Sequence, residues 1–181
     1  MEKLFNNATG MAKHLFGNQN SLYVAQYGWQ QYLGDDTYTF GYIASYKEAA
    51  DILVEQKQPD LLLFPIVFCY RQYLELLLKN IYHKNKTSKE YIDFIKRSSH
   101  NLEKIWKDVK CFINLSSEDL DAMEELVLVF NQLDPSSMNF RYEFGKDQTR
   151  LLSNPITIDT YIMKRFIDAI DDQLRYTYDT P

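Results

Sequence analysis

The sequence predicts an all-α protein, a bundle of five to seven helices with one short extended segment around 140–144. Apolar residues recur at three- and four-residue spacing through nearly every segment, which is the period of a helix with one buried face. Residues that start and stop helices separate these segments. One stretch, Leu61–Tyr82, is apolar almost all round, as expected of a helix in the middle of a bundle.

The central stretch, LLLFPIVFCYRQYLELLLKNIY, carries a polar stripe at Arg71, Glu75 and Lys79. The spacing of four residues stacks these side chains along one face of a helix, so the sequence predicts an ion-pair network in which each carboxylate reaches a cation. The three charges and Pro65 favour the core of a soluble bundle over a membrane span.

The first part of the chain is expected to be an extension, residues 1–36, that is helical or irregular and packs on a bundle domain of residues 37–181. Apolar spacing predicts a short helix from Leu4 to Phe16. The aromatic, Gln-rich stretch Ser21–Leu33 is interpreted as a cover over the bundle, with a partner surface as the alternative.

One helix is expected before the central one, and another directly after it. Ile43 and Val54 mark the apolar face of a helix that ends before Pro59. After the central helix, Thr87 and Glu90 have the spacing of a capping box, which predicts a short helix. The apolar residues of that short helix are Tyr91, Ile92, Phe94 and Ile95.

Three more helices are expected towards the C-terminus, from near Ser99 to about Ile113, from the NLSS start signal to Leu133, and from Asp159 to Tyr176. The residues predicted to face inward on the last helix are Tyr161, Ile162, Phe166, Ile170 and Leu174. The predicted core residues are Leu74, Leu77, Leu78, Ile105, Trp106, Phe130 and Ile170.

The composition limits the function classes. A net charge of −5 argues against a protein that coats nucleic acid by bulk electrostatics. Charge is nevertheless segregated, because Lys84–Lys110 holds eight basic and four acidic residues whereas Ser117–Asp134 holds six acidic residues and no basic one. We interpret this either as a local RNA-binding patch or as two faces that attract each other, within the domain or across a dimer.

Other features indicate a soluble, cytoplasmic protein that is not membrane-bound and uses no cofactor. Cys69 and Cys111 form no CxxC pair, the N-terminus lacks the apolar core of a signal peptide, and no glycine-rich phosphate loop occurs. No metal site is expected, because the three histidines, His14, His83 and His100, have no partner at metal-ligand spacing.

The candidate catalytic residues are Arg71, His100 and Arg141. A guanidinium beside an imidazole suits metal-free RNA cleavage, since one stabilises phosphorane charge and the other moves a proton. The alternative for His100, in SSHNL, is a role in binding free backbone N–H groups at a helix start or in packing under Trp106.

The candidate RNA-binding cations are Lys104, Lys107, Lys110 and Arg97. Aromatic residues are interleaved with the basic ones of this segment, and bases stack on aromatic rings while cations hold phosphates. These aromatics are Tyr82, Tyr91, Phe94 and Trp106. The alternative is that they belong to the core, as the helical spacing of Ile92, Ile95, Ile105 and Trp106 suggests.

Three motifs, PIVFCYRQYLELLLKNIY, SHNLEKIW and LDPSSMNFRYEF, resemble the HEPN superfamily of small helical bundles from prokaryotic toxin–antitoxin and phage-defence systems. The resemblance covers Tyr42–Tyr176. It matches the family's E-x-x-x-K pattern with Glu75 and Lys79, its His-x-Leu turn with His100, and its Arg-Tyr pair with Arg141. It implies a homodimer and, in active members, a metal-independent endoribonuclease.

The chain departs from the nuclease motif of that family, an Arg and a His four to six residues apart. No histidine follows His100, and Arg97 and His100 have two residues between them. The resemblance therefore implies a protein that acts on or binds RNA in a defence or toxin–antitoxin system. The alternative is a noncatalytic dimerisation or interaction module with a partner protein from the same locus.

Overall fold

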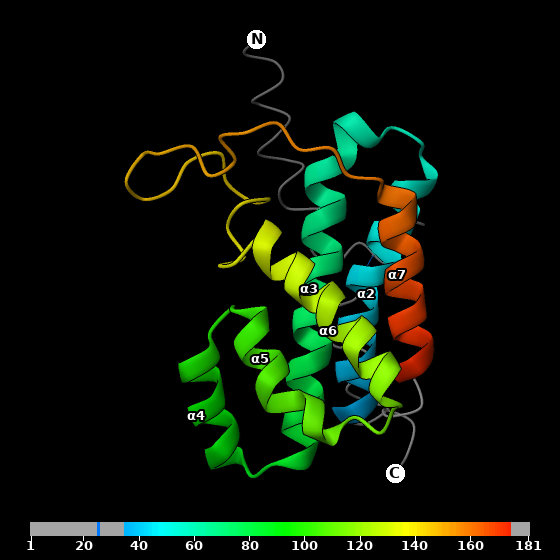
Figure 1. Ribbon diagram of the computed structural model, residues 1–181, viewed down its shortest axis with the longest axis vertical. Helices are drawn as coiled ribbons and strands as arrows, with labels where there is room; N and C mark the ends of the chain where they lie inside the picture. The colour runs from blue at the N-terminus through cyan, green and yellow to red at the C-terminus, as the bar shows by residue number, and fades with distance from the viewer. Residues whose placement is uncertain (1–24, 26–34, 175–181) are drawn as a thin grey trace, which may run out of the picture. The chain divides into compact units, whose positions relative to one another are not determined.

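The computed structural model describes Ala25 and residues 35–174, and the side chains from Thr39 onward within that range (Figure 1). The expected helix from Leu4 to Phe16 lies outside the described residues, as does nearly all of the expected aromatic cover from Ser21 to Leu33. The chain divides into two compact units, residues 1–38 and 39–181, and the second unit is the helical bundle.

Helices make up most of the described residues, which confirms the predicted all-α class. They are α2 (Asp35–Glu55), α3 (Pro59–Asn85), α4 (Ser88–Ser98), α5 (Leu102–Val109), the 3₁₀ helix η2 (Lys110–Phe112), α6 (Ser117–Leu133) and α7 (Thr160–Leu174). Within the described residues, strand-like pairing is limited to one isolated antiparallel bridge between Phe144 and Arg150.

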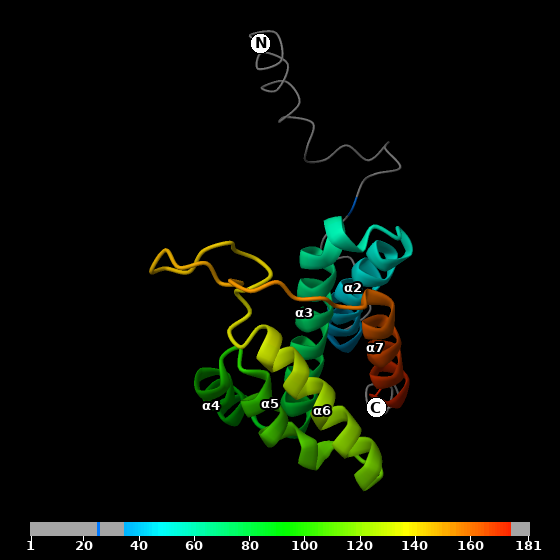
Figure 2. The same cartoon turned by 45° about the horizontal axis from the view of Figure 1, so that its top comes forward.

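The α3 helix is the centre of the bundle. It packs against α4, α5 and α7, and α5 packs in turn against α6. In both views α2 and α7 lie on one side of α3 while α4 and α5 lie on the other (Figures 1 and 2). By length and composition α3 is also apolar enough to cross a membrane, a property that it shares with the core helices of soluble proteins, and half of its most apolar window is buried.

The predicted core is confirmed, since all seven residues named from the sequence are buried. Hydrogen bonds from the polar ends of tyrosine and lysine side chains fix the helices around this core relative to one another. The Tyr70 hydroxyl of α3 donates to Asp51 of α2 at 2.7 Å, and Lys47 of α2 donates to Asp51 and to Asp168 of α7 at 2.7 and 2.5 Å. The Tyr73 hydroxyl donates to Asp171 of α7 at 2.7 Å. These bonds hold α2 and α7 in register on one side of α3.

Side-chain caps start the shorter helices. The predicted capping box is confirmed, because Glu90 N–H donates to Thr87 Oγ1 (3.4 Å) while Thr87 N–H donates to Glu90 Oε2 (3.0 Å). Ser116 caps α6 by accepting from Asp119 N–H at 3.1 Å. Each cap satisfies backbone donors that a helix start leaves without an intrahelical partner.

The structure corrects the predicted face of α7. Tyr161, Ile162 and Phe166 are exposed, whereas Met163 and Ile167 are buried together with Ile170 and Leu174. The buried residues recur at spacings of three and four, and Ile162 and Phe166 lie on the neighbouring face, along a groove with α6. Ile92 of α4, which the sequence placed among core-like residues, is likewise exposed.

The segment expected to be extended around 140–144 is instead irregular. Arg141 and Tyr142 N–H both donate to the Met138 carbonyl, at 3.1 and 3.0 Å, which makes a turn. Extended pairing is confined to Phe144, in its bridge to Arg150. This connection between α6 and α7 passes over the N-terminal part of α3 (Figures 1 and 2), where the rings of Phe140 and Phe64 lie 5.9 Å apart.

Candidate functional site

A cluster of charged side chains surrounds Glu75 on α3, and we call it the Glu75 centre. Nη1 of Arg71 donates to Glu75 Oε2 at 2.7 Å, and Nζ of Lys79 donates to Glu75 Oε1 at 2.6 Å. Arg71 and Glu75 are fully buried, and the Lys79 side chain is 12% exposed. The predicted ion-pair network is therefore present, because the four-residue spacing brings all three groups to one face of the helix.

Glu75 is held in its ionised form. Burial raises the pKa of the Glu75 carboxyl, but the hydrogen bonds and charges of Lys79 and Arg71 outweigh burial and lower that pKa below its usual value. A buried carboxylate that stays charged can orient a cationic or proton-carrying partner.

Arg71 binds two backbone carbonyls in addition to Glu75. Nε donates to the Asp134 carbonyl at 2.9 Å, and Nη2 donates to the His100 carbonyl at 2.5 Å. The Asp134 carboxylate is also fully buried and lies 3.6 Å from Nε. Because the guanidinium is 0% exposed, Arg71 cannot meet a phosphate in solvent; it fixes the backbone that carries His100.

The turn between α4 and α5 presents His100 to the Glu75 centre. Ser99 closes α4 with a positive φ of 50° and donates its N–H to the Ile95 carbonyl at 2.9 Å. Asn101, and not His100, caps α5, by accepting from Lys104 N–H at 2.9 Å. The alternative in which His100 binds the free N–H groups of the helix start is therefore wrong.

The His100 ring bonds Glu75 through Nδ1, at 2.9 Å from Oε1, and its side chain is 51% exposed. Lys79 donates to the same oxygen, so the ammonium and the imidazole are neighbours. A carboxylate that accepts from Nδ1–H leaves Nε2 as the unprotonated acceptor of the neutral ring. The sequence predicted that Arg71 and His100 lie close together, and they do. Arg71 bonds the backbone carbonyl of His100, whereas the imidazole ring of His100 bonds Glu75.

Arg141 contacts a different part of the fold. Its Nε donates to the Ser137 carbonyl at 2.5 Å, and its guanidinium lies over the rings of Phe68 and Tyr142, at 5.7 and 5.4 Å. The predicted convergence of three residues therefore reduces to Arg71 and His100, with Arg141 exposed near the preceding turn of α3, beside Phe68.

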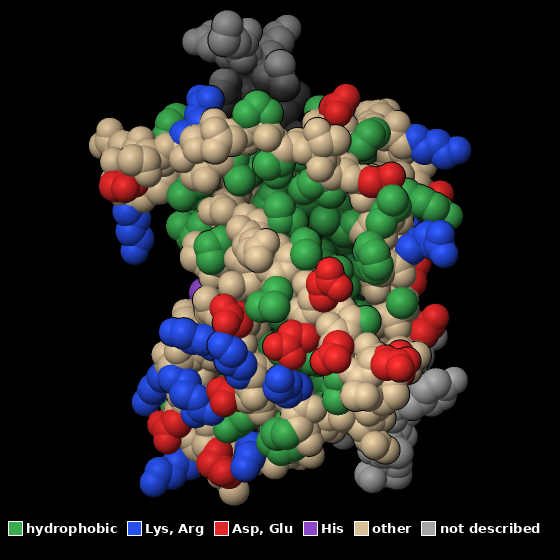
Figure 3. All heavy atoms as spheres, viewed as in Figure 1, with side chains coloured by type: hydrophobic (Ala, Val, Ile, Leu, Met, Phe, Trp, Pro, Cys, Tyr) green, Lys and Arg blue, Asp and Glu red, His purple; other side chains and the backbone are tan. Residues whose placement is uncertain are grey.

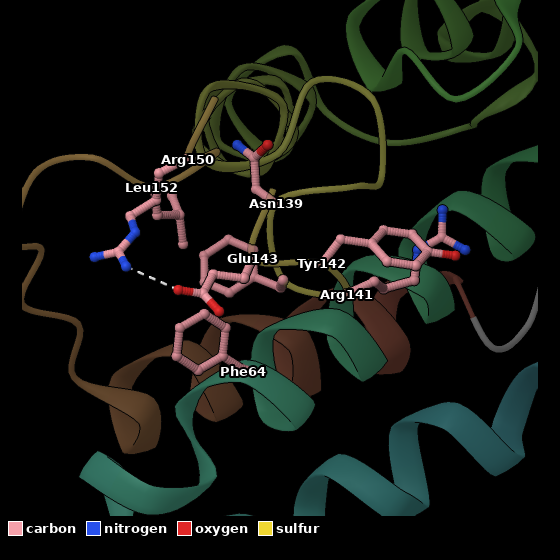
Figure 4. Close-up of a pocket in the computed structure, with 8 residues that line it drawn as sticks. Phe64, Asn139, Arg141, Tyr142, Glu143, Arg150 and Leu152 are labelled. Atoms are coloured by element: carbon pink, nitrogen blue, oxygen red, sulfur yellow. Dashed lines mark hydrogen bonds and ion pairs between the residues drawn. The ribbon is translucent and has the colours of Figure 1, made fainter. Parts of the chain in front are cut away.

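Next to Arg141, the α6–α7 connection and α3 enclose a pocket of about 430 Å³, which we call the loop pocket. Its lining includes Phe64 of α3 and, from the connection, Asn139, Phe140, Glu143, Arg150 and Leu152. Figure 4 shows Phe64 facing Glu143 across the pocket, with Arg141 and Tyr142 together at one edge. Glu143 and Arg150 form an ion pair of 2.8 Å.

Asp134 joins the loop pocket to the Glu75 centre. Its carbonyl accepts from Arg71, and its Oδ1 accepts from the N–H groups of Met138 and Asn139 at 2.7 and 3.1 Å. The sequence places Asp134 among the acidic residues of Ser117–Asp134 and predicts no structural contact for it. An Asp at the end of a helix can accept hydrogen bonds from the backbone of the turn that follows. This property of the residue type is the sequence feature that indicates the role of Asp134.

The predicted RNA-binding cations form a surface on α4 and α5, where basic side chains gather in Figure 3. Three of them are paired on the surface: Arg97 with Asp108 (2.9 Å), Lys107 with Glu103 (2.6 Å) and Lys110 with Glu124 (3.1 Å). Lys104 is exposed. Exposed pairs of this kind are weak, so a phosphate can compete for the cations.

The aromatic part of that RNA-binding prediction is wrong. Tyr82, Phe94 and Trp106 are buried, and Tyr82 stacks on Phe94 with ring centroids 3.9 Å apart. A ring already packed in the core cannot stack on a base, so these side chains support α4 and α5 from within. Tyr91 is partly buried against the same core.

Among the described residues, no group of three or more His, Cys, Asp or Glu side chains is placed to hold a metal ion. No protein-family model matches the chain, and searches of curated proteins and of solved structures found no significant match. The fold and the site thus define a helical bundle with a histidine oriented by a buried carboxylate.

Proposed function

We propose that the protein binds RNA and cleaves it without a metal ion, with His100 as the proton acceptor. The observation that supports this most directly is the bond between His100 Nδ1 and the buried Glu75 carboxylate, with the ring half-exposed. An oriented imidazole whose Nε2 faces a substrate is the usual general base of such reactions. The resemblance to HEPN proteins favours a role in a prokaryotic defence or toxin–antitoxin system, whereas the cleavage chemistry is inferred from the Glu75 centre, because the chain lacks the nuclease motif of that family.

The proposed step uses the RNA's own 2′-hydroxyl as nucleophile. Nε2 of His100 takes the proton of the 2′-hydroxyl, and the 2′-oxygen attacks the adjacent phosphorus. The P–O2′ bond forms, the P–O5′ bond breaks, and the departing 5′-oxygen takes up a proton from solvent. The products are a 2′,3′-cyclic phosphate and a 5′-hydroxyl end.

Lys79 is the cation next to the reacting phosphate in this proposal, because it shares the Glu75 oxygen with His100. A fixed cation stabilises the charge that develops on the phosphorane. Arg71 and Glu75 are positioning residues, since both are buried and act through His100. Arg141 and the cations of α4 and α5 bind more distant phosphates.

The test is incubation of labelled single-stranded RNA with the protein in the presence of EDTA. The wild type is expected to cleave, and His100→Ala should reduce the rate by at least about 100-fold, which is the lower end of general-base contributions. His83→Ala is the matched control, because His83 is an exposed histidine that contacts Tyr91, and it should cleave like wild type. Equal activity of His100→Ala and wild type would contradict the proposal.

A second candidate function is that of a homodimeric interaction module, and a groove between α6 and α7 favours it. The groove encloses about 670 Å³ and is lined by apolar side chains that include exposed Val129, Ile162 and Phe166. In Figure 3 the apolar surface lies above a band of acidic side chains, with the basic side chains of α4 and α5 beyond them.

We propose a second copy of the chain as the occupant of this groove. A two-fold axis along the long dimension of that face sets the basic α4–α5 surface of one copy against the acidic α6 of the other. In sedimentation at micromolar concentration, wild type should run at twice 21.5 kDa and Phe166→Glu at 21.5 kDa. Ile52→Glu, at an equally exposed apolar residue of α2, outside the proposed interface, is the control that should stay dimeric. A monomeric wild type would overturn the dimer.

A further inference from the structure

The loop pocket has the size of a small-ligand site. Its volume of about 430 Å³ falls within the range of roughly 300–1,000 Å³ that such sites occupy. One wall is the helical α3 and the other is the α6–α7 connection, which Asp134 and Arg71 fix to the core. Hydrogen bonds in the interior of the bundle therefore hold this wall of the pocket in place.

Phe64 offers an aromatic ring to whatever enters. Its side chain is 49% exposed although it lies on the central helix, and the buried Phe140 backs it at a centroid distance of 5.9 Å and an angle of 54°. A large ring that is held by a core residue on one side and open on the other is a stacking platform for a planar group.

Polar groups on the same pocket match the edges of a nucleobase. Glu143 and Arg150 pair at 2.8 Å with side chains 63% and 62% exposed, so their mutual bond is weak and either can turn to a ligand. Nδ2 of Asn139 donates to the Leu133 carbonyl at 2.8 Å, which ties this side of the pocket to the end of α6. Arginine and glutamate are side chains that read guanine and cytosine edges.

Arg141 supplies a positioned cation at the edge of the pocket. The Ser137 carbonyl and the faces of Phe68 and Tyr142 hold its guanidinium. The charge remains exposed, so it can bind a phosphate that follows a base in the pocket. A stacking ring, base-edge groups and a phosphate cation in one place are what recognition of an unpaired nucleotide requires.

The pocket and the Glu75 centre share one side of α3. Phe64, Phe68, Arg71 and Glu75 are spaced at four, three and four residues, so they follow one face of the helix. At 1.5 Å of rise per residue, Phe64 and Glu75 are about 16 Å apart along the axis. One short single strand can therefore contact both places.

We propose that the loop pocket binds an unpaired nucleobase of single-stranded RNA, stacked on Phe64, with the adjoining phosphate on Arg141. This inference rests on the proposed action on RNA and adds the class of substrate, a single strand with an unstacked base a short distance from the cleaved bond.

The test measures the affinity of an uncleavable, 2′-O-methylated single strand for the full chain by fluorescence anisotropy. Phe64→Ala should weaken binding by roughly 5- to 150-fold, the range found when a base loses its aromatic partner. Phe64→Tyr, which keeps the ring, should bind like wild type. Tyr161→Ala is the matched control, since Tyr161 is an exposed aromatic residue of α7 that lines neither the loop pocket nor the α6–α7 groove. An abasic strand with the same phosphates should bind wild type as weakly as the normal strand binds Phe64→Ala.

The outcomes separate this inference from the proposed function. If wild type binds RNA and Phe64→Ala binds it equally well, the pocket assignment is wrong and the role of His100 is unaffected. If Phe64→Ala binds weakly but wild type does not cleave RNA in EDTA, the base pocket stands and the ribonuclease proposal fails. If wild type does not bind RNA at low salt, both are overturned.

Discussion

Arg71 carries a charge that has lost all contact with solvent, and its partners must replace the lost hydration. Glu75, the Asp134 carboxylate and two backbone carbonyls surround it. With Lys79 included, two cations face two carboxylates, so the formal charges of these four side chains balance. The position of His100 thus depends on a set of interior ions.

Replacing Arg71 with methionine should lower the free energy of unfolding by about 3–5 kcal/mol, because it leaves a buried carboxylate without its partner. Urea unfolding followed by circular dichroism measures this change. Lys107→Met is the control, since Lys107 pairs with Glu103, its side chain is 61% exposed, and the change should leave the free energy of unfolding nearly unchanged. Equal, small losses for both variants would contradict the interior role of Arg71.

Glu75 should make the free energy of unfolding depend on pH in the acidic range. Burial raises the Glu75 pKa, but Lys79 and Arg71 lower it by more than burial raises it, so the folded pKa lies below the usual 4.5. A lowered folded pKa adds stability that is complete above pH 4.5 and is lost as the pH falls through the folded value. Unfolding free energies measured across this range should fall less steeply in Glu75→Gln. Equal slopes in the two proteins would contradict this account of Glu75.

At single residues, the sequence predicted what depends on local spacing. The ion pairs of Glu75 follow from residues four apart on one helix, and the capping box at Thr87 follows from residues three apart. The bond between Glu75 and His100 joins residues of different elements. The sequence predicted that His100 would lie close to Arg71, but not that its ring would bond Glu75. Arg141 was misplaced because its partner, the Ser137 carbonyl, is part of a turn that no sequence motif specifies.

Among the helices, α3 contacts α2 through a hydroxyl hydrogen bond as well as through packed side chains such as the rings of Phe68 and Tyr46, 6.4 Å apart. The Tyr70 hydroxyl donates to Asp51, and burial together with this bond raises the pKa of Tyr70, so the hydroxyl keeps its proton. Asp51 in turn accepts from Lys47, which bridges to α7. The arrangement of three helices therefore depends on a hydrogen bond that begins at one tyrosine.

Tyr70→Phe should lower the free energy of unfolding by about 0.5–1.5 kcal/mol, the usual net value of one intramolecular hydrogen bond. Thermal and urea unfolding measure the loss. Tyr161→Phe should leave stability unchanged, because Tyr161 is 60% exposed on α7. A Tyr70→Phe variant as stable as wild type would show that the hydroxyl adds nothing to the link between α2 and α3.

The number and order of the helices could be predicted because each has its own periodicity and its own start and stop residues. The face of α7 could not, since residues on two neighbouring stripes are apolar there. Met163 and Ile167 are buried, while Ile162 and Phe166 line the groove with α6. Periodicity alone cannot tell a core stripe from an apolar stripe that borders a groove.

The whole unit has three surfaces that differ in chemistry: the basic α4–α5 surface, the apolar α6–α7 groove, and the face of α3 with the loop pocket and His100. The sequence indicated the first through its charge pattern. It gave no sign of the groove or of the loop pocket, because each is lined by side chains from elements far apart in the chain. Phe64 and Arg150, for example, are brought together only by the tertiary fold.

We propose that His100, oriented by Glu75, removes the proton of an RNA 2′-hydroxyl. Mass spectrometry of the RNA ends, after incubation of a single strand with the full chain in EDTA, tests this step most directly. We expect 2′,3′-cyclic phosphate and 5′-hydroxyl ends with wild type, and an intact strand with His100→Ala or with a 2′-O-methylated substrate. Products with 3′-hydroxyl and 5′-phosphate ends, or an intact strand with wild type, would contradict the proposed step.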